Sequence, residues 1–328
     1  MLHAILFDGM PTFQEPTFDD ISAARKRISH LAKRTPVMTS RGFNQVTGVE
    51  AFFKCENLQT GGAFKIRGAA NFVYSIPESD RARGVVAFSS GNHAQAVAIA
   101  AQSLSIPATL VMPLDAPRTK AEAAADRGAR IVNYDRFTED RAAISQRIVE
   151  QSGATLVPPF DHPWIMAGAG TLVPELFEEA SALDALVVCV GGGGMISGCS
   201  IAAKHLSPGI RVFGVEPMDA NDTYLSMKAG KRVEIAPPAT IADGLRSQMP
   251  GSLTFPLVQK YVEQILLVSE EEIKATVKYL LMRMKILAEP SGAVSAAAVL
   301  FKKLPPEIRR VGVVISGGNV DYEVLKGL

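Results

Sequence analysis

Lys65 is the residue whose neighbours most favour nucleophilic chemistry. It stands between Phe64 and Ile66, directly after the Gly61-Gly62 turn, at a predicted helix start. Apolar neighbours remove water from an ammonium group, so its pKa falls and the neutral amine attacks an aldehyde. The alternative is a lysine with a solvated tip and its stem on an apolar surface, and this segment alone leaves both interpretations open.

Four consecutive glycines, Gly191, Gly192, Gly193 and Gly194, indicate an anion site. They follow a predicted buried strand and open a predicted helix, where backbone N–H groups and the helix N-terminus bind phosphate. The loop contains neither a Walker Gly-Lys-Ser/Thr nor a Gly-x-Gly-x-x-Gly pattern. Glu216 follows where a ribose-binding acid would stand, so NAD stays open as an alternative, as does a flexible turn. A single phosphate monoester fits better.

The elements that must position these residues alternate between short apolar strands and helices. Strands are predicted at 85–88, 108–112, 129–134, 185–190, 211–215 and 311–315, and helices at 93–104, 119–127 and 195–205. Continuous apolar strands between helices predict an α/β, doubly wound fold with parallel sheets covered on both faces. We expect residues 1–83 and 161–328 to form a large domain, and 84–160 a small inserted one.

Composition excludes several classes of function. The chain has 328 residues and a formal net charge of +1, with no run of basic residues, which predicts no nucleic-acid or membrane partner. The first ten residues lack the basic region of a signal peptide, and no apolar run is long enough to span a membrane. Cys55, Cys189 and Cys199 fit no zinc motif and are expected to be buried reduced thiols, which suits the cytoplasm.

Four motifs together resemble a known family. The Lys65 segment, the turn Ser89-Ser90-Gly91-Asn92-His93, the tetraglycine loop and Ser316-Gly317-Gly318-Asn319 occur in the order seen in fold-type II pyridoxal-phosphate (PLP) enzymes. The chain is similar to the serine/threonine dehydratase and serine racemase family, including the threo-3-hydroxyaspartate dehydratases, from about residue 18 to 325. The resemblance implies a tryptophan synthase β-like fold, a PLP cofactor and a homodimer.

The resemblance also implies roles for single residues. Lys65 would carry the cofactor as an imine and then move protons at the substrate Cα. The remaining cofactor-binding residues would be Phe64, Asn92, Gly191, Gly192, Gly193, Gly194, Met195 and Ser316. Asn92 would bond the phenolic oxygen, and the neutral Ser316 would contact the ring nitrogen. Ser89, Ser90, Asn92 and His93 would hold the substrate carboxylate at a helix N-terminus.

Three residues bear on the substrate and the outcome. A serine occupies the position of Ser90 in serine racemases, where a second base is needed, so we include Ser90 with Lys65 as catalytic; the alternative is a hydroxyl that only orders the turn. Arg141 matches an arginine that would meet a distal carboxylate, or else is an exposed helix residue. Ser247 would assist in substrate binding.

Glu216, Ala220 and Asp222 predict a metal site. Two carboxylates and a backbone carbonyl on an irregular loop suit Mg²⁺, Mn²⁺ or Ca²⁺. Spacing alone favours a solvated acidic loop, whereas metal-activated members of the family carry the same trio. The expected role is structural.

These observations predict an ammonia-lyase that converts a small 3-hydroxy amino acid to a 2-keto acid and ammonia. Threo-3-hydroxyaspartate is preferred over serine and threonine because of Ser90, Arg141 and the metal trio. Serine racemisation and β-replacement are the alternatives within the family. A catalytically inert PLP- or amino-acid-binding protein is the alternative from another class.

Overall fold

The computed structural model describes residues 14–89, 91–116, 122, 124–135 and 137–327. Its strands are β1 (Val37–Thr39), β2 (Glu50–Cys55), β3 (Val85–Phe88), β4 (Ala108–Pro113), β5 (Arg130–Tyr134), β6 (Thr155–Leu156), β7 (Ala185–Cys189), β8 (Arg211–Pro217), β9 (Gln264–Val268) and β10 (Arg310–Ile315). Its α-helices are α1 (Phe18–Ile28), α2 (Arg41–Thr47), α3 (Lys65–Ser75), α4 (Glu78–Arg81), α5 (Asn92–Ser103), α7 (Arg141–Ser152), α8 (Pro163–Gly170), α9 (Leu172–Glu179), α10 (Gly194–Leu206), α11 (Asp222–Ala229), α12 (Thr254–Tyr261), α13 (Glu270–Tyr279), α14 (Pro290–Leu300) and α15 (Tyr322–Lys326). Short 3₁₀ segments are η2 (Glu56–Leu58), η3 (Thr60–Gly62) and η4 (Asp243–Leu245), and η5 (Leu280–Met284) is a π-helical turn.

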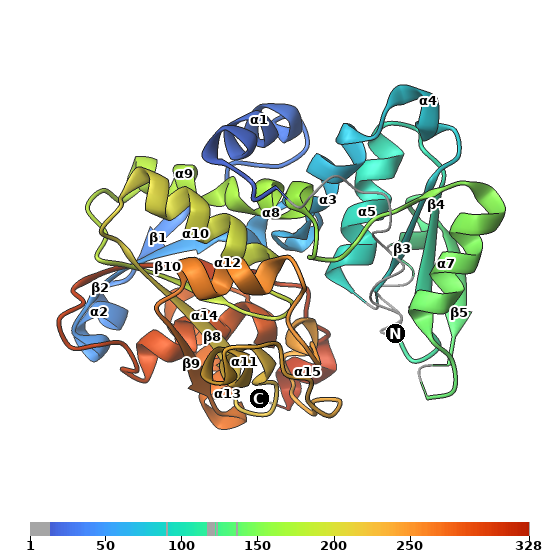
Figure 1. Cartoon of the computed structure of the whole chain (residues 1–328). Helices are drawn as coiled ribbons and strands as arrows, with labels where there is room; N and C mark the ends of the chain where they lie inside the picture. The colour runs from blue at the N-terminus through green and yellow to red at the C-terminus, as the bar shows by residue number, and fades with distance from the viewer. Residues whose placement is uncertain (1–13, 90, 117–121, 123, 136, 328) are drawn as a thin grey trace.

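The larger part of the fold is a six-stranded sheet in the order β1-β2-β10-β7-β8-β9. Helices α8, α9 and α10 lie on one side of it and α13 and α14 on the other (Figure 1). Strand β7 is buried along its whole length, as the continuous apolar run predicts. One strand departs from the expected parallel arrangement: β1 pairs antiparallel with β2. An antiparallel edge strand is a common addition to an otherwise parallel sheet.

The smaller part is a four-stranded parallel sheet in the order β5-β4-β3-β6. The alanine-rich helix α5 packs against β3 and β4 and against α3, while α7 packs against β3, β4 and β6. All four strands fall inside the segment predicted to be an inserted domain, whose boundaries stay a prediction. Residues 119–121 and 123 of the helix predicted at 119–127 lie outside the described residues.

Strands β2, β10, β7 and β8 run parallel, so their carboxyl ends meet at one edge of the large sheet. Loops at this edge are where open α/β sheets bind ligands. The Lys65 segment follows β2, Ser316 follows β10 and the tetraglycine loop follows β7. No helix among the described residues is long and apolar enough to cross a membrane.

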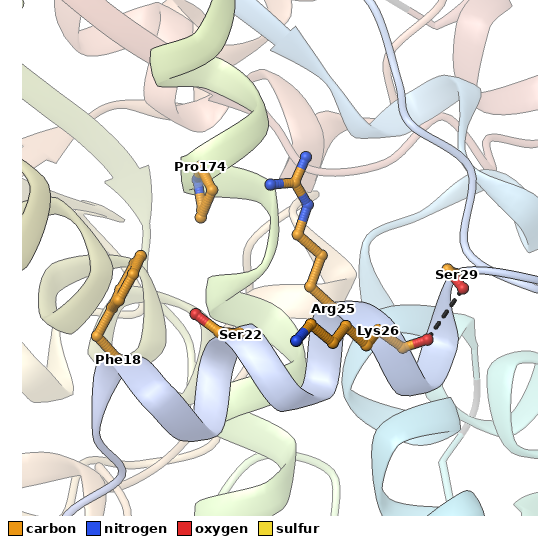
Figure 2. A pocket seen from close by; sticks show the side chains of 6 residues that line it. All are labelled: Phe18, Ser22, Arg25, Lys26, Ser29 and Pro174. Carbon is orange, nitrogen blue, oxygen red and sulfur yellow. Dashed lines mark hydrogen bonds between the residues drawn. The ribbon is translucent and has the colours of Figure 1, made fainter.

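Helix α1 lies on the outside of α8 and borders a surface hollow of about 480 Å³ (Figure 2). Phe18, Ser22, Arg25, Lys26, Ser29 and Pro174 line this hollow. The Arg25 guanidinium is already paired with Glu178 at 2.7 Å. None of the residues predicted to do chemistry lines it, so the functional site lies elsewhere.

Candidate active site

Lys65 is the first residue of α3, as predicted, and the residue is half-buried. Its Nζ donates to the carbonyl oxygen of Pro159 at 2.8 Å and lies 5.1 Å from the centre of the Phe64 ring. Burial lowers the pKa of Lys65 from its ordinary 10.5 to about 8. A substantial fraction of the amine is therefore neutral near physiological pH, as a nucleophile requires.

The tetraglycine loop is a tight cradle. A Cβ on Gly192 would stand 2.4 Å from the Phe160 ring, and one on Gly194 would stand 2.8 Å from the Phe160 carbonyl. Gly193 has a φ of +93°, and a Cβ there would stand 2.7 Å from the Thr254 hydroxyl. Only glycine fits these positions, and Gly194 opens the 13-residue helix α10. The backbone of the loop can thus approach a bound anion closely, and the loop lies at the N-terminus of a helix, whose dipole favours negative charge. Both features are typical of a phosphate site.

Ser316 lies beside the lysine segment. The Phe64 N–H donates to the Ser316 carbonyl at 3.0 Å, and the Cys189 thiol donates to the Ser316 hydroxyl at 3.4 Å. Cys189 lies two positions before Gly191, the first residue of the glycine loop. Met195 is buried behind the loop. The structure therefore brings Phe64, Lys65, Ser316 and the glycine loop to one place.

The predicted substrate turn lies at the start of α5. The Ser89 hydroxyl accepts from the Gly91 N–H at 3.2 Å, while Ser90 lies outside the described residues. His93 is buried, and its Nε2 donates to the Val157 carbonyl at 3.1 Å, since a carbonyl only accepts. Burial, and then the charge of Lys65, lower the pKa of His93 to about 3, so its imidazole is neutral. His93 and Lys65 donate to the carbonyls of Val157 and Pro159, two residues apart on one segment, so the turn lies close to the lysine.

Two further polar residues that the sequence interpretation did not assign orient Asn92. Its Nδ2 donates to the buried Glu289 carboxylate at 2.6 Å, and its Oδ1 accepts from Asn319 Nδ2 at 2.9 Å. These bonds fix which way the amide faces. Asn319 belongs to the quoted Ser-Gly-Gly-Asn motif, which was a signal available in the sequence; Glu289 stands directly before Pro290 and had no such motif.

Arg141 and Ser247 lie on the periphery. Arg141 is exposed at the first position of α7, with its guanidinium 5.3 Å from the centre of the Phe88 ring. Phe88 directly precedes the 89–93 turn, so Arg141 borders that turn. Ser247 lies near the glycine loop, because a Cβ on Gly191 would stand 3.5 Å from its hydroxyl.

Glu216, Ala220 and Asp222 are all buried, but only Ala220 lies on the irregular loop that was expected to carry all three. Glu216 lies within β8 and Asp222 is the first residue of α11. The Glu216 carboxylate accepts from the N–H groups of Thr223 and Tyr224, whereas neither Asp222 carboxylate oxygen has a hydrogen-bond partner in the described chain. Burial raises the pKa of Asp222 to about 7, and burial and the Asp222 charge raise that of Glu216. Two buried carboxyl groups that repel each other are typical of a cation site.

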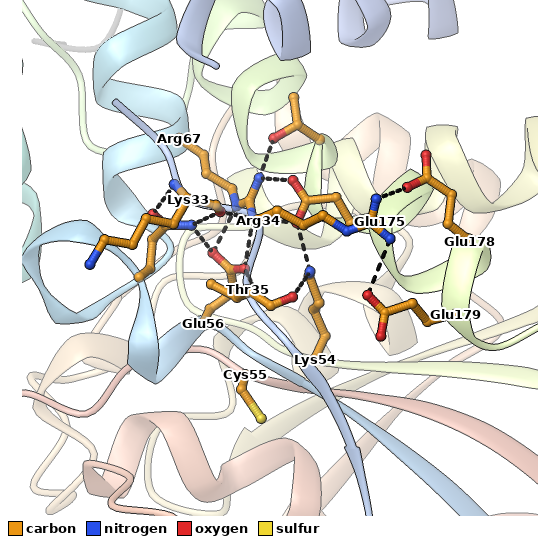
Figure 3. Close-up of polar contacts among 12 residues, drawn as sticks. Lys33, Arg34, Thr35, Lys54, Cys55, Glu56, Arg67, Glu175, Glu178 and Glu179 are labelled. Atoms are coloured by element: carbon orange, nitrogen blue, oxygen red, sulfur yellow. Dashed lines mark hydrogen bonds and ion pairs between the residues drawn. The ribbon is translucent and has the colours of Figure 1, made fainter. Parts of the chain in front are cut away.

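A buried ion cluster, defined as Arg67, Glu56, Glu175 and Lys54, anchors the helix that carries Lys65 (Figure 3). Arg67 in the first turn of α3 donates to both carboxylates, at 2.7 to 2.9 Å. Lys54 donates to Glu175 at 2.6 Å. Burial alone would raise the pKa of Glu56, but the Arg67 charge and hydrogen bonds lower it. The cluster is neutral as a whole, and it ties α3 to η2, β2 and α9.

Comparisons with known proteins agree with this geometry. Residues 28–317 match the model of the pyridoxal-phosphate dependent enzyme family. The chain is 48% identical over 308 residues to a serine racemase of Schizosaccharomyces pombe, covering 94% of this chain and 95% of that protein. It is 47% identical over 308 residues to an L-threo-3-hydroxyaspartate ammonia-lyase of Saccharomyces cerevisiae, covering 94% of each. The solved structure of maize serine racemase superposes with a TM-score of 0.92 at 39% identity, covering 96% of this chain and 97% of that one.

Proposed function

The chain belongs to the family of pyridoxal-phosphate-dependent enzymes with the fold-type II architecture, and from that premise we propose that it is an ammonia-lyase for a 3-hydroxy amino acid, with threo-3-hydroxyaspartate preferred. The observation that carries the proposal is the position of the Lys65 amine. Its Nζ donates to the carbonyl of Pro159, in the segment that also accepts from His93 and packs Phe160 against Gly192, and burial lowers its pKa to about 8. The relatives named as L-threo-3-hydroxyaspartate ammonia-lyases, at 47% identity, support the choice of reaction and substrate.

The residues present fit the cofactor. The cradle made by Gly192, Gly193 and Gly194 has no room for a side chain, which suits a phosphate bound by backbone N–H groups. Asn92, oriented by Glu289, has an amide N–H left to bond the phenolic oxygen. Phe64, Met195 and Ser316 complete the set that would hold the ring.

When bound, pyridoxal phosphate supplies an electron-withdrawing ring that makes the substrate Cα–H acidic. Lys65 Nζ then takes the proton from Cα, for which its lowered pKa suits it. Ser89, Asn92 and His93 hold the substrate carboxylate at the N-terminus of α5, and the neutral His93 does not compete as a base. The hydroxyl leaves Cβ as water, and water taken up again in the hydrolysis releases a 2-keto acid and ammonia.

The experiment that tests the function uses the purified protein with pyridoxal phosphate. We expect an absorbance band of the lysine-bound cofactor, and keto acid and ammonia formed in equal amounts from threo-3-hydroxyaspartate. Serine and threonine are run in parallel. Lys65→Ala should lose both the band and the activity, whereas Lys326→Ala, at an exposed lysine, should keep them. Borohydride reduction and peptide mapping identify the modified lysine; a label on another lysine, or no band at all, overturns the proposal and favours an inert protein.

Serine racemisation is the second candidate, favoured by the 48% identity to a serine racemase and by Ser90. Ser90 would supply the second base on the opposite face of Cα. Incubation with L-serine and chiral analysis of the product tests it, with Ser90→Ala as the variant. D-serine formation that survives this substitution rules out the role of Ser90, and no D-serine from the wild type rules out the activity.

We also propose a divalent cation bound by Glu216, Asp222 and the Ala220 carbonyl. The two unpartnered Asp222 oxygens support it, since buried carboxylates are normally paired or coordinate a metal. Oxygen ligands favour Mg²⁺, Mn²⁺ or Ca²⁺, and the role would be structural. The described residues contain no group of three or more His, Cys, Asp and Glu side chains that could hold a metal, so the backbone carbonyl is needed.

A cytoplasmic homodimer is the proposed state of the protein. The three cysteines are free and buried, which suits a reducing compartment. The dimer rests on the resemblance to the family, and light scattering of the purified holoenzyme measures it directly.

A further inference from the structure

The carbonyl of Gly192, in the middle of the glycine loop, is held by two donors from one segment. The Thr254 hydroxyl donates to it at 2.7 Å, and the Gly251 N–H donates to it at 3.2 Å. Thr254 is completely buried. The loop is therefore not oriented by its own sequence alone, because a residue some sixty positions away determines where this carbonyl points.

This contact determines the direction of the next N–H group. In a trans peptide the C=O of one residue and the N–H of the next point to opposite sides. Since the Gly192 carbonyl faces Thr254, the Gly193 N–H faces away from Thr254. A peptide turned the other way would present a carbonyl oxygen to an anion in the cradle, and the two would repel.

Thr254 is itself held on both sides. The Asp161 carboxylate accepts from the N–H groups of Ser252, Leu253 and Thr254 and from the Ser252 hydroxyl, at 2.8 to 3.1 Å. The Thr254 carbonyl accepts from the Ser197 hydroxyl on α10 at 3.4 Å. Asp161 adjoins Phe160, whose ring closes the cradle over Gly192. Residues 160 and 161 therefore act on the loop in two ways. The Phe160 ring packs over Gly192, and the Asp161 carboxylate holds the segment that carries Thr254.

We propose that Thr254, fixed by Asp161, is a positioning residue for the phosphate loop: its hydroxyl turns the Gly192–Gly193 peptide so that the N–H faces the cofactor phosphate. The inference rests on the proposed function, in which the loop holds that phosphate. It assigns to Thr254 an effect on phosphate recognition and none on the ring or on the amine of Lys65.

The test compares pyridoxal phosphate with pyridoxal, which has the aldehyde and ring but no phosphate. Dissociation constants of both are measured on the apoprotein for the wild type, Thr254→Val and Thr254→Ser. Valine has the shape of threonine without the donor, and serine keeps the donor. We expect Thr254→Val to raise the dissociation constant of pyridoxal phosphate about tenfold, which corresponds to the loss of one hydrogen bond. The dissociation constant of pyridoxal should stay unchanged. Thr254→Ser should stay near the wild type, and the ³¹P resonance of the bound phosphate should move only in Thr254→Val.

Equal weakening of both ligands in Thr254→Val, or no weakening, overturns the inference, because general damage to the fold does not discriminate between them. Asp161→Asn is the second variant and should lower the same affinity ratio; an unchanged ratio in this variant also counts against the inference. Far-UV circular dichroism and thermal unfolding confirm that each variant is folded. If the wild type itself does not prefer pyridoxal phosphate to pyridoxal, the phosphate role of the loop fails, which is a different result.

Discussion

The amine of Lys65 donates to the carbonyl of Pro159 at 2.8 Å, so the nucleophile is held by the segment that leaves the small sheet. Two residues earlier, the Val157 carbonyl accepts from His93, and one residue later Phe160 covers the glycine loop. Residues 157–160 therefore contact all three parts of the proposed site. A neutral carbonyl accepts from the amine without adding a charge that would raise its pKa again.

The lowered pKa of Lys65 predicts the pH dependence of cofactor attachment. Only the neutral amine attacks the aldehyde, so the rate should rise with pH up to the pKa and then level off. With a pKa of about 8, the rate of attachment levels off by about pH 9. For a lysine with an ordinary pKa, this rate would still rise at pH 10. Stopped-flow absorbance on the apoprotein measures the rate, with Nα-acetyl-lysine as the reference amine. A rate that keeps rising beyond pH 9.5 contradicts the shift.

The sequence predicted the parts of the site that lie in local motifs. The glycine loop and the 89–93 turn each follow a predicted apolar strand, and a strand followed by glycine or a polar turn can be recognised in the sequence. Lys65 was identified from its apolar neighbours and the preceding Gly61-Gly62 turn. Glu289 and Thr254 were missed because they are far in sequence from the residues they contact. Glu289 is 197 residues from Asn92, and Thr254 is 62 residues from Gly192. No local pattern marks such contacts. Strands β1, β2, β6 and β9 were missed as well.

Asp222→Asn should abolish stabilisation by a divalent cation. Millimolar Mg²⁺ at about one hundred times its Kd should add about 2.7 kcal/mol to the free energy of unfolding of the wild type, and EDTA should reverse it. The variant loses one charged ligand and should show no such response. Without metal it should be about 1 kcal/mol more stable than the wild type at pH 8, because a buried charge facing Glu216 is removed. Thermal unfolding with and without Mg²⁺ measures both effects; a variant that still responds like the wild type argues against this site.

Arg67→Met should destabilise the fold strongly. It leaves the buried carboxylates of Glu56 and Glu175 with Lys54 as their one remaining cation in the cluster, and the expected loss is about 3–5 kcal/mol. Arg67→Lys keeps the charge but not the fork that binds both carboxylates, so its loss should be intermediate. Urea unfolding of the apoprotein measures the free energies.

The matched control for the cluster is Arg25→Met, which breaks an equally short ion pair with Glu178 at the surface. Solvent screens that pair, so the loss should be about 0.5 kcal/mol. Equal losses for Arg67→Met and Arg25→Met would show that burial adds nothing to the cluster.

Arg141→Ala should separate acidic from neutral substrates. The exposed guanidinium borders the 89–93 turn through Phe88, where it would pair with the distal carboxylate of threo-3-hydroxyaspartate. Loss of that charge-assisted pair should lower kcat/KM for hydroxyaspartate about thirtyfold, mainly through KM, and leave serine unchanged, because serine has no distal carboxylate. Arg147→Ala on the same helix is the control, since Arg147 is also exposed but lies almost two turns further along α7. Steady-state assays with both substrates measure the ratio, and a parallel fall for serine and hydroxyaspartate in Arg141→Ala would assign this arginine to the fold and not to substrate choice.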